Sequence, residues 1–221
     1  MGNVFVNKTI SVRLLTKHYA GMFFLVSGAA GLLLFFNQSH IYFRNACIAF
    51  LLTFLYSVPL LPLNKLAFLR KAGFVKTILL AFTWAYVTAY LPLAHVFLHN
   101  TTEGCLFISN RFLFMLVLCI IFDNRDIAVD KIRGLHSLST DVKPFVMQLI
   151  VLTCFVLLVV INLFFYKYQG VLFQMLALQL STVITLLVYF FSWKKRSYFF
   201  YYFIVDGMVF LSALLTTVAS I

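Results

Sequence analysis

The chain has 221 residues, of which 63% are apolar and only 10% are charged, and its formal net charge is +11. A soluble domain carries roughly 25% charged residues, so the composition excludes an ordinary soluble protein and indicates a polytopic membrane protein. The positive charge does not indicate nucleic acid as a partner, because the Lys and Arg residues are spread over several short polar segments instead of forming one patch.

Seven apolar stretches are long enough, or nearly so, to span a bilayer, which takes about 20 helical residues. They are predicted at 19–36, 46–62, 77–98, 106–122, 144–166, 171–192 and 198–219. Arg111 interrupts the fourth stretch. The sequence therefore predicts an all-α fold, a single transmembrane helix bundle of about seven helices over residues 1–221. Its polar loops are expected at about 63–76, 123–143 and 193–197.

The distribution of basic residues predicts the orientation of this bundle. If the N-terminus is cytoplasmic, only three of the 17 Lys and Arg residues fall in outside segments, namely Arg44, Arg111 and Lys167. Cytoplasmic loops of membrane proteins carry an excess of Lys and Arg. We therefore expect a cytoplasmic N-terminus, an external C-terminus, and all three predicted polar loops on the cytoplasmic side.

The most informative polar segment follows the fourth apolar stretch and contains Asp123, Asp126 and Asp130, half of the six acidic residues. On a helix, this spacing places the three carboxylates on one face. Such a face repels itself unless a cation lies in front of it, and Mg²⁺ is commonly held by a few carboxylates together with substrate phosphates. The spacing therefore predicts a Mg²⁺ and diphosphate site at the membrane surface.

A second interpretation of this segment involves no ligand. Arg125, Lys131 and Arg133 lie among the aspartates, and they can pair with the carboxylates in a purely structural network. Both interpretations remain open from the sequence.

Two features elsewhere in the chain are candidates for the same site. One is the segment from Tyr56 to Lys76, which contains Lys65, Arg70 and Lys71. Its cations can face a diphosphate, face lipid headgroups, or only set the topology. Asp206 lies inside the last apolar stretch. An ionisable group there costs about 2.5–3.5 kcal/mol even on the lenient insertion scale and is a functional candidate by default, although a structural hydrogen bond is the other interpretation.

These residues together resemble a known family. Asp123, Asp126 and Asp130, followed by Arg133-Gly134, are similar to the second Asp-rich motif of the UbiA-type membrane prenyltransferases. The segment from Tyr56 to Lys76 resembles the basic loop of that family, and Asp206-Gly207 resembles its last helix.

The resemblance implies a UbiA-like bundle in a bacterial inner membrane that transfers an isoprenyl group from a polyprenyl diphosphate to a lipophilic acceptor. It implies that Mg²⁺ is held by Asp123, Asp126 and Asp130. The substrate-side residues that it implies are Tyr56, Lys65, Arg70, Lys71, Lys131, Arg133 and Asp206.

The chain departs from the family pattern in one important respect. The first Asp-rich motif and the two helices that would carry it have no counterpart, and Glu103 is the only acidic residue before Asp123. Either these helices were lost from the gene or its predicted start, or a divergent enzyme works with one motif, or the protein is catalytically inactive. An inactive relative would bind a lipid diphosphate or act as a partner subunit. A small transporter or receptor is a third hypothesis, which the scarcity of paired ionisable residues in the spans disfavours.

Overall fold

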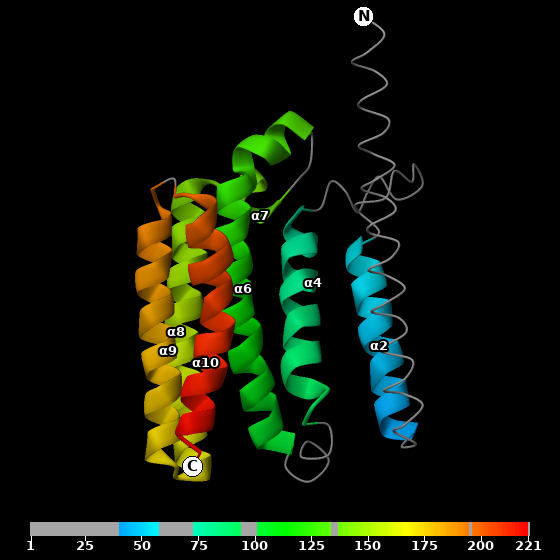
Figure 1. Ribbon diagram of the computed structural model, residues 1–221, viewed down its shortest axis with the longest axis vertical. Helices are drawn as coiled ribbons and strands as arrows, with labels where there is room; N and C mark the ends of the chain where they lie inside the picture. Colours follow the sequence, from blue (N-terminus) through cyan, green and yellow to red (C-terminus); the bar gives the residue numbers. More distant parts are fainter. Residues whose placement is uncertain (1–39, 58–72, 94–100, 134–136, 195, 221) are drawn as a thin grey trace, which may run out of the picture. The chain divides into compact units, whose positions relative to one another are not determined.

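The computed structural model describes residues 40–57, 73–93, 101–133, 137–194 and 196–220, and every regular element in these ranges is a helix (Figure 1). The elements are α2 (His40–Ser57), α4 (Gly73–Ala85), the π-helical segment η3 (Tyr86–Tyr90), α6 (Thr101–Arg133), α7 (Leu138–Asp141), α8 (Pro144–Gln169), α9 (Leu172–Ser192), the π-helical segment η4 (Phe200–Val205) and α10 (Asp206–Val218). The chain forms two units, Met1–Ala46 and Cys47–Ile221, and all packing described below lies within the second.

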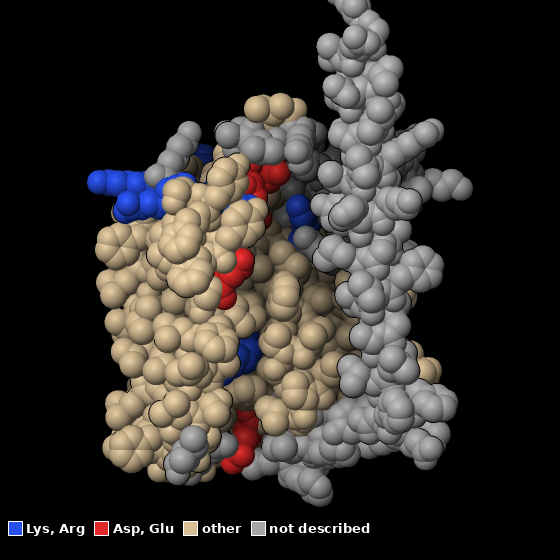
Figure 2. Space-filling view, viewed as in Figure 1, with Lys and Arg blue, Asp and Glu red and all other residues tan. Residues whose placement is uncertain are grey.

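Four of the described helical segments are long and apolar enough to cross a membrane: Thr101–Ile127, Pro144–Tyr168, Leu172–Ser192 and Phe200–Val218. They carry many large apolar side chains on the outside, and Figure 2 shows a mostly tan side over this part of the molecule. Apolar surface of this extent marks a membrane interface rather than a soluble exterior. The chain is an integral membrane protein.

Four spans are found in the described residues, and the predicted total of about seven stays a prediction, because the stretches at 19–36, 46–62 and 77–98 lie wholly or partly outside those residues. The stretches predicted at 46–62 and 77–98 correspond to shorter apolar helices in the described residues, Phe43–Thr53 and Phe74–Tyr90. Both are shorter than the roughly 20 residues that a bilayer requires. The stretch predicted at 19–36 lies outside the described residues.

Helix α6 is the central element of the second unit. It packs against α4, α7, α8 and α9, and Figure 1 shows it running beside its neighbours over much of its length. Every residue from Phe114 to Ile121 is buried. A helix that is apolar on all sides in this way is enclosed by other helices. The packing of α6 therefore determines where the polar residues at its two ends lie.

The predicted polar loop at 123–143 is helical over much of its length, because α6 continues through the Asp-rich segment to Arg133. Asp, Arg, Ala and Lys are tolerated in helices and this stretch contains neither Gly nor Pro, so the helix continues where hydropathy falls. The three aspartates therefore lie on a helix, as their predicted position on one helical face requires.

Helix α8 has clear start and stop signals. Pro144 occupies its first turn, where the missing N–H is harmless, and Lys143 before it is extended. Gly170 ends the helix with φ 69°, a left-handed conformation that glycine adopts without strain, and its N–H donates to the Tyr166 carbonyl at 2.7 Å. This tight ending lets α9 return antiparallel to α8.

A chain of buried amide and hydroxyl groups joins three helices in the interior. The Asn110 Nδ2 of α6 donates to the Asn162 Oδ1 of α8 at 2.6 Å, and the Asn162 Nδ2 donates to the Thr182 Oγ1 of α9 at 3.3 Å. All three side chains are buried. Because polar groups in hydrocarbon find partners on neighbouring helices, this Asn110–Asn162–Thr182 network fixes the register of α6, α8 and α9.

Candidate functional site

The end of the bundle at which α6 and α9 finish and α8 and η4 begin is called the motif end here, because α6 brings the Asp-rich segment to it. Blue Lys and Arg side chains project from this end in Figure 2 (upper left). At the opposite end, α8 turns into α9 and α10 finishes.

The structure separates the roles of the aspartates in the segment. Asp123 faces α4, where its Oδ2 accepts a 2.6 Å hydrogen bond from the Thr77 hydroxyl. Asp126 is engaged by Arg125, whose Nε and Nη2 donate to its two carboxylate oxygens at 2.7 Å each. The Asp130 side chain is half-buried.

Arg125 is held at the motif end by aromatic rings as well as by Asp126. Its guanidinium carbon lies 5.1, 5.3 and 5.1 Å from the ring centroids of Phe122, Tyr201 and Tyr202. Its buried Nη1 has no hydrogen-bond partner among the described residues. Stacking on several rings favours a fixed guanidinium, and η4 supplies two of those rings. A π-helical segment of this kind is often found at functional sites.

A polar pocket of about 770 Å³ opens beside this cation. It is lined by Asn124, Arg125, Asp126, Ile127, Pro144, Met147, Gln148, Tyr189, Ser192, Trp193, Arg196, Tyr198 and Tyr201. Two guanidinium groups, from Arg125 and Arg196, therefore border one space. The Arg196 Nε donates to the Phe191 carbonyl at 3.0 Å, which holds this exposed side chain near the end of α9.

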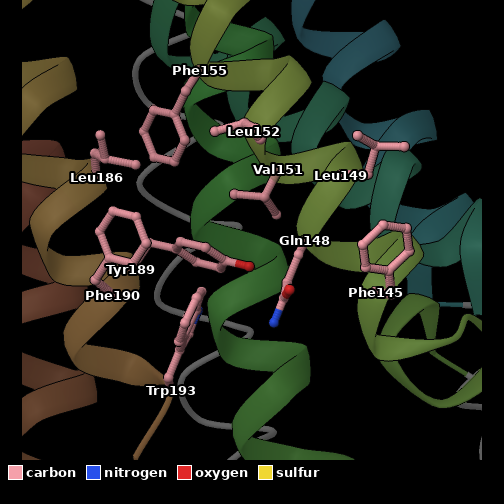
Figure 3. A pocket seen from close by; sticks show the side chains of 10 residues that line it. All are labelled: Phe145, Gln148, Leu149, Val151, Leu152, Phe155, Leu186, Tyr189, Phe190 and Trp193. Atoms are coloured by element: carbon pink, nitrogen blue, oxygen red, sulfur yellow. The ribbon is translucent and has the colours of Figure 1, made fainter.

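An apolar groove of about 250 Å³ lies between α8 and α9. In Figure 3, Leu186, Tyr189, Phe190 and Trp193 lie on the α9 side of the groove, opposite side chains of α8 such as Leu152. Gln148, Tyr189 and Trp193 line both cavities. The two cavities therefore adjoin, and together they suit a molecule with a charged head and an apolar tail.

The carboxylates are chemically suitable for Mg²⁺, which prefers oxygen ligands. Among the described residues, however, no group of three or more His, Cys, Asp or Glu side chains gathers closely enough to hold a metal ion. Thr77 and Arg125 bind two of the three aspartates instead. For Asp126, the structure has the ion pair with Arg125 that the ligand-free interpretation of the sequence required. The Asp126 side chain is still 41% exposed, so a further partner can reach it.

The other predicted site residues are distributed as follows. Asp206 begins α10 with an exposed side chain, and Arg125 is the cation whose charge acts on its carboxylate. Lys65, Arg70 and Lys71 lie outside the described residues, as do the side chains of Tyr56, Lys131 and Arg133. The structure therefore brings Asp126 to the polar pocket, while the predicted basic loop stays a prediction.

Sequence reasoning missed several residues of the pocket. Trp193 and Arg196 lie in the polar loop predicted at 193–197, and Gln148 and Tyr189 lie within predicted spans, but none of the four is a site residue predicted from the sequence. A sequence signal existed, because Trp and Arg close together at the end of an apolar stretch mark a membrane interface. The antiparallel return of α9 is what brings them beside Arg125, and that pairing is not written in local sequence.

Comparison with family models, with curated proteins and with solved structures finds no match for this chain.

Proposed function

We propose that the chain is a UbiA-like membrane protein that binds an isoprenyl diphosphate at the motif end. The diphosphate would occupy the polar pocket, and the isoprenyl chain would lie in the apolar groove between α8 and α9. One observation carries the proposal: the two cavities share Gln148, Tyr189 and Trp193. Two adjoining cavities, one bordered by two cations and the other apolar, suit the head and the tail of this class of lipid.

The head of the ligand would be recognised by the two guanidinium groups. Arg binds phosphate oxygens through a planar fork of donors, and Arg125 and Arg196 border the same pocket. Asp126 competes for this fork, because it already accepts both hydrogen bonds from Arg125. A ligand with several negative charges competes better than one with a single charge, which favours a diphosphate over a carboxylate.

The reaction that we propose is transfer of the isoprenyl group to a lipophilic acceptor. Mg²⁺ would supply positive charge against the departing diphosphate only if Asp123, Asp126 and Asp130 drew together, with Asp123 released from Thr77 and Asp126 from Arg125. The chain's own contribution would come from Arg125 and the apolar groove, which would orient the substrate and exclude water from it. We place the protein in a bacterial inner membrane with the motif end in the cytoplasm.

A second candidate function is binding without catalysis, as an inactive relative or a partner subunit. The observation that favours it is the engagement of the carboxylates: Thr77 binds Asp123 and Arg125 binds Asp126. Under this alternative the lipid diphosphate binds through Arg125 and Arg196, and no metal is required.

The chain offers a direct optical test, because Trp84 and Trp193 are its two tryptophans. In a Trp84→Phe background, Trp193 reports on both cavities. We expect farnesyl diphosphate to change its fluorescence saturably, and Arg125→Gln to weaken binding roughly tenfold or more, the usual loss for a charge-assisted bond. Leu152→Phe tests the groove without adding a second fluorescent tryptophan. It should weaken binding of the lipid but not of inorganic pyrophosphate.

The two candidate functions predict opposite effects of Asp126→Asn. If the diphosphate binds directly to Arg125, removal of the competing carboxylate should strengthen binding in the absence of Mg²⁺. If the diphosphate binds through Mg²⁺, the same substitution should abolish binding. Farnesyl diphosphate that leaves the Trp193 signal unchanged, with or without Mg²⁺, would rule out both candidates.

A further inference from the structure

A third cavity, of about 430 Å³, lies at the opposite end of the bundle among α6, α8, α9 and α10. Its lining includes Glu103, Phe107, Arg111, Gln174, Thr216 and Thr217. About 21 Å of α6 separates Arg111 from Arg125, at 1.5 Å per residue, so this cavity is distinct from the polar pocket. Its volume falls within the range of about 300–1,000 Å³ that is typical of ligand sites.

Arg111 is the cation in the lining of this cavity. Its Nη1 donates to the Ser212 hydroxyl at 2.6 Å, and its guanidinium lies 5.2 Å from the centroid of the Phe107 ring. Among the described residues the one ion pair is Arg125–Asp126, so Arg111 has no carboxylate within ion-pairing distance there. One hydroxyl and one ring face leave most of its five donors and its whole charge for another partner.

Arg111 lies within a segment that crosses the membrane, Thr101–Ile127. A cation at that position is expensive unless water or an anion accompanies it. Glu103 lines the same cavity, but eight residues of helix place it about 12 Å away along the axis. An anion entering from the membrane surface is therefore the natural partner for Arg111.

The hydroxyl groups of α10 narrow the chemistry of the ligand. Thr217 donates its proton to the Ala213 carbonyl at 2.9 Å, and Thr216 donates to the Ser212 and Ala213 carbonyls, each at 2.9 Å. Their oxygens are thus left to the cavity as acceptors. Acceptors repel an oxyanion but bind hydroxyl donors, so the site suits a head that carries an anion and free hydroxyls together.

We propose that this cavity binds the phosphoglycerol headgroup of an anionic membrane lipid. The phosphate would bind Arg111 and the glycerol hydroxyls would donate to Thr216 and Thr217. The acyl chains would follow the apolar outer surface of the helices. This site is independent of the proposed isoprenyl diphosphate site, because the two share no lining residue.

Native mass spectrometry of the full chain released from detergent tests the proposal by counting retained lipids. We expect phosphatidylglycerol to be retained in preference to phosphatidylcholine, and Arg111→Gln to weaken its binding roughly tenfold to a hundredfold. Lys167→Gln is the matched control, since it removes one charge from the exposed last turn of α8 at the same end, outside the cavity. It should leave binding unchanged.

A second variant keeps the test decisive if Arg111→Gln fails to fold. Thr216→Val with Thr217→Val leaves the charge intact and removes the hydroxyl acceptors, so it should weaken phosphatidylglycerol several-fold while leaving phosphatidic acid unaffected. Equal phosphatidylglycerol binding by the wild type and both variants would overturn the proposal. Soluble glycerol phosphate that binds as tightly as the lipid would also overturn it, and would assign the cavity to a soluble anion.

Discussion

The buried Asn110–Asn162–Thr182 network allows a quantitative test of how the bundle is held together. Asn162→Ala removes two hydrogen bonds from a fully buried side chain and leaves the Asn110 amide without its acceptor. Typical losses for such changes amount to about 1–3 kcal/mol. The coupling free energy of an interhelical hydrogen bond in a membrane protein is smaller, on average about 0.6 and at most about 1.7 kcal/mol, because the unfolded chain also finds partners for its polar groups.

The appropriate measurement is a double-mutant cycle of Asn110→Ala and Asn162→Ala, read from reversible unfolding in mixed micelles by far-UV circular dichroism. We expect a coupling free energy of roughly 0.6–1.7 kcal/mol. Gln179→Ala is the control, because its Nε2 also bridges α9 to α8, at 3.3 Å to the Val159 carbonyl, but in an exposed position. A coupling energy of zero, or an Asn162→Ala loss no greater than that of Gln179→Ala, would refute the assigned contact.

Three further predictions concern the motif end and the topology. Thr77→Val removes the hydrogen bond to Asp123 and should lower the free energy of unfolding by about 1–3 kcal/mol, whereas Thr77→Ser should keep it; equal losses would contradict the contact. Prenyl transfer by the 221-residue chain should be undetectable or very slow, and restored by an N-terminal extension carrying the first Asp-rich motif; robust turnover that is lost in Asp123→Ala and in Asp130→Ala would show that one motif suffices. A reporter fused after Ile221 should score as external, and a cytoplasmic signal would reverse the proposed orientation.

The sequence predicted the helices from α6 onward because each depends on a local property. Continuous apolar stretches ended by Gly170 or begun by Pro144 specify a helix and its limits without reference to the rest of the fold. The extension of α6 to Arg133 was missed because hydropathy falls at Asp123 while helix propensity does not. Hydropathy alone therefore located the spans but not the ends of the helix that carries the candidate site.

The site itself was only partly predictable, because it depends on which helices become neighbours. The Asp-rich segment identified Asp126. Spacing alone does not decide that Arg125 pairs with Asp126 and not with Asp123 or Asp130, because that choice depends on local geometry. Trp193 and Arg196 reach the pocket only because α9 returns beside α6 and α8. The Asn110–Asn162 contact likewise joins residues far apart in sequence.

Helix α6 carries a cation near each end, and the partners of the two cations set different conditions for binding. Arg125 and Arg111 both lie over aromatic rings, but only Arg125 has a carboxylate partner among the described residues. A ligand at the motif end must therefore compete with Asp126 for the charge of Arg125, which disfavours singly charged anions there. A ligand at Arg111 displaces no carboxylate, so a single phosphate charge is sufficient. Under the two proposals made above, the same residue type on one helix would bind a diphosphate at one end and a phospholipid head at the other.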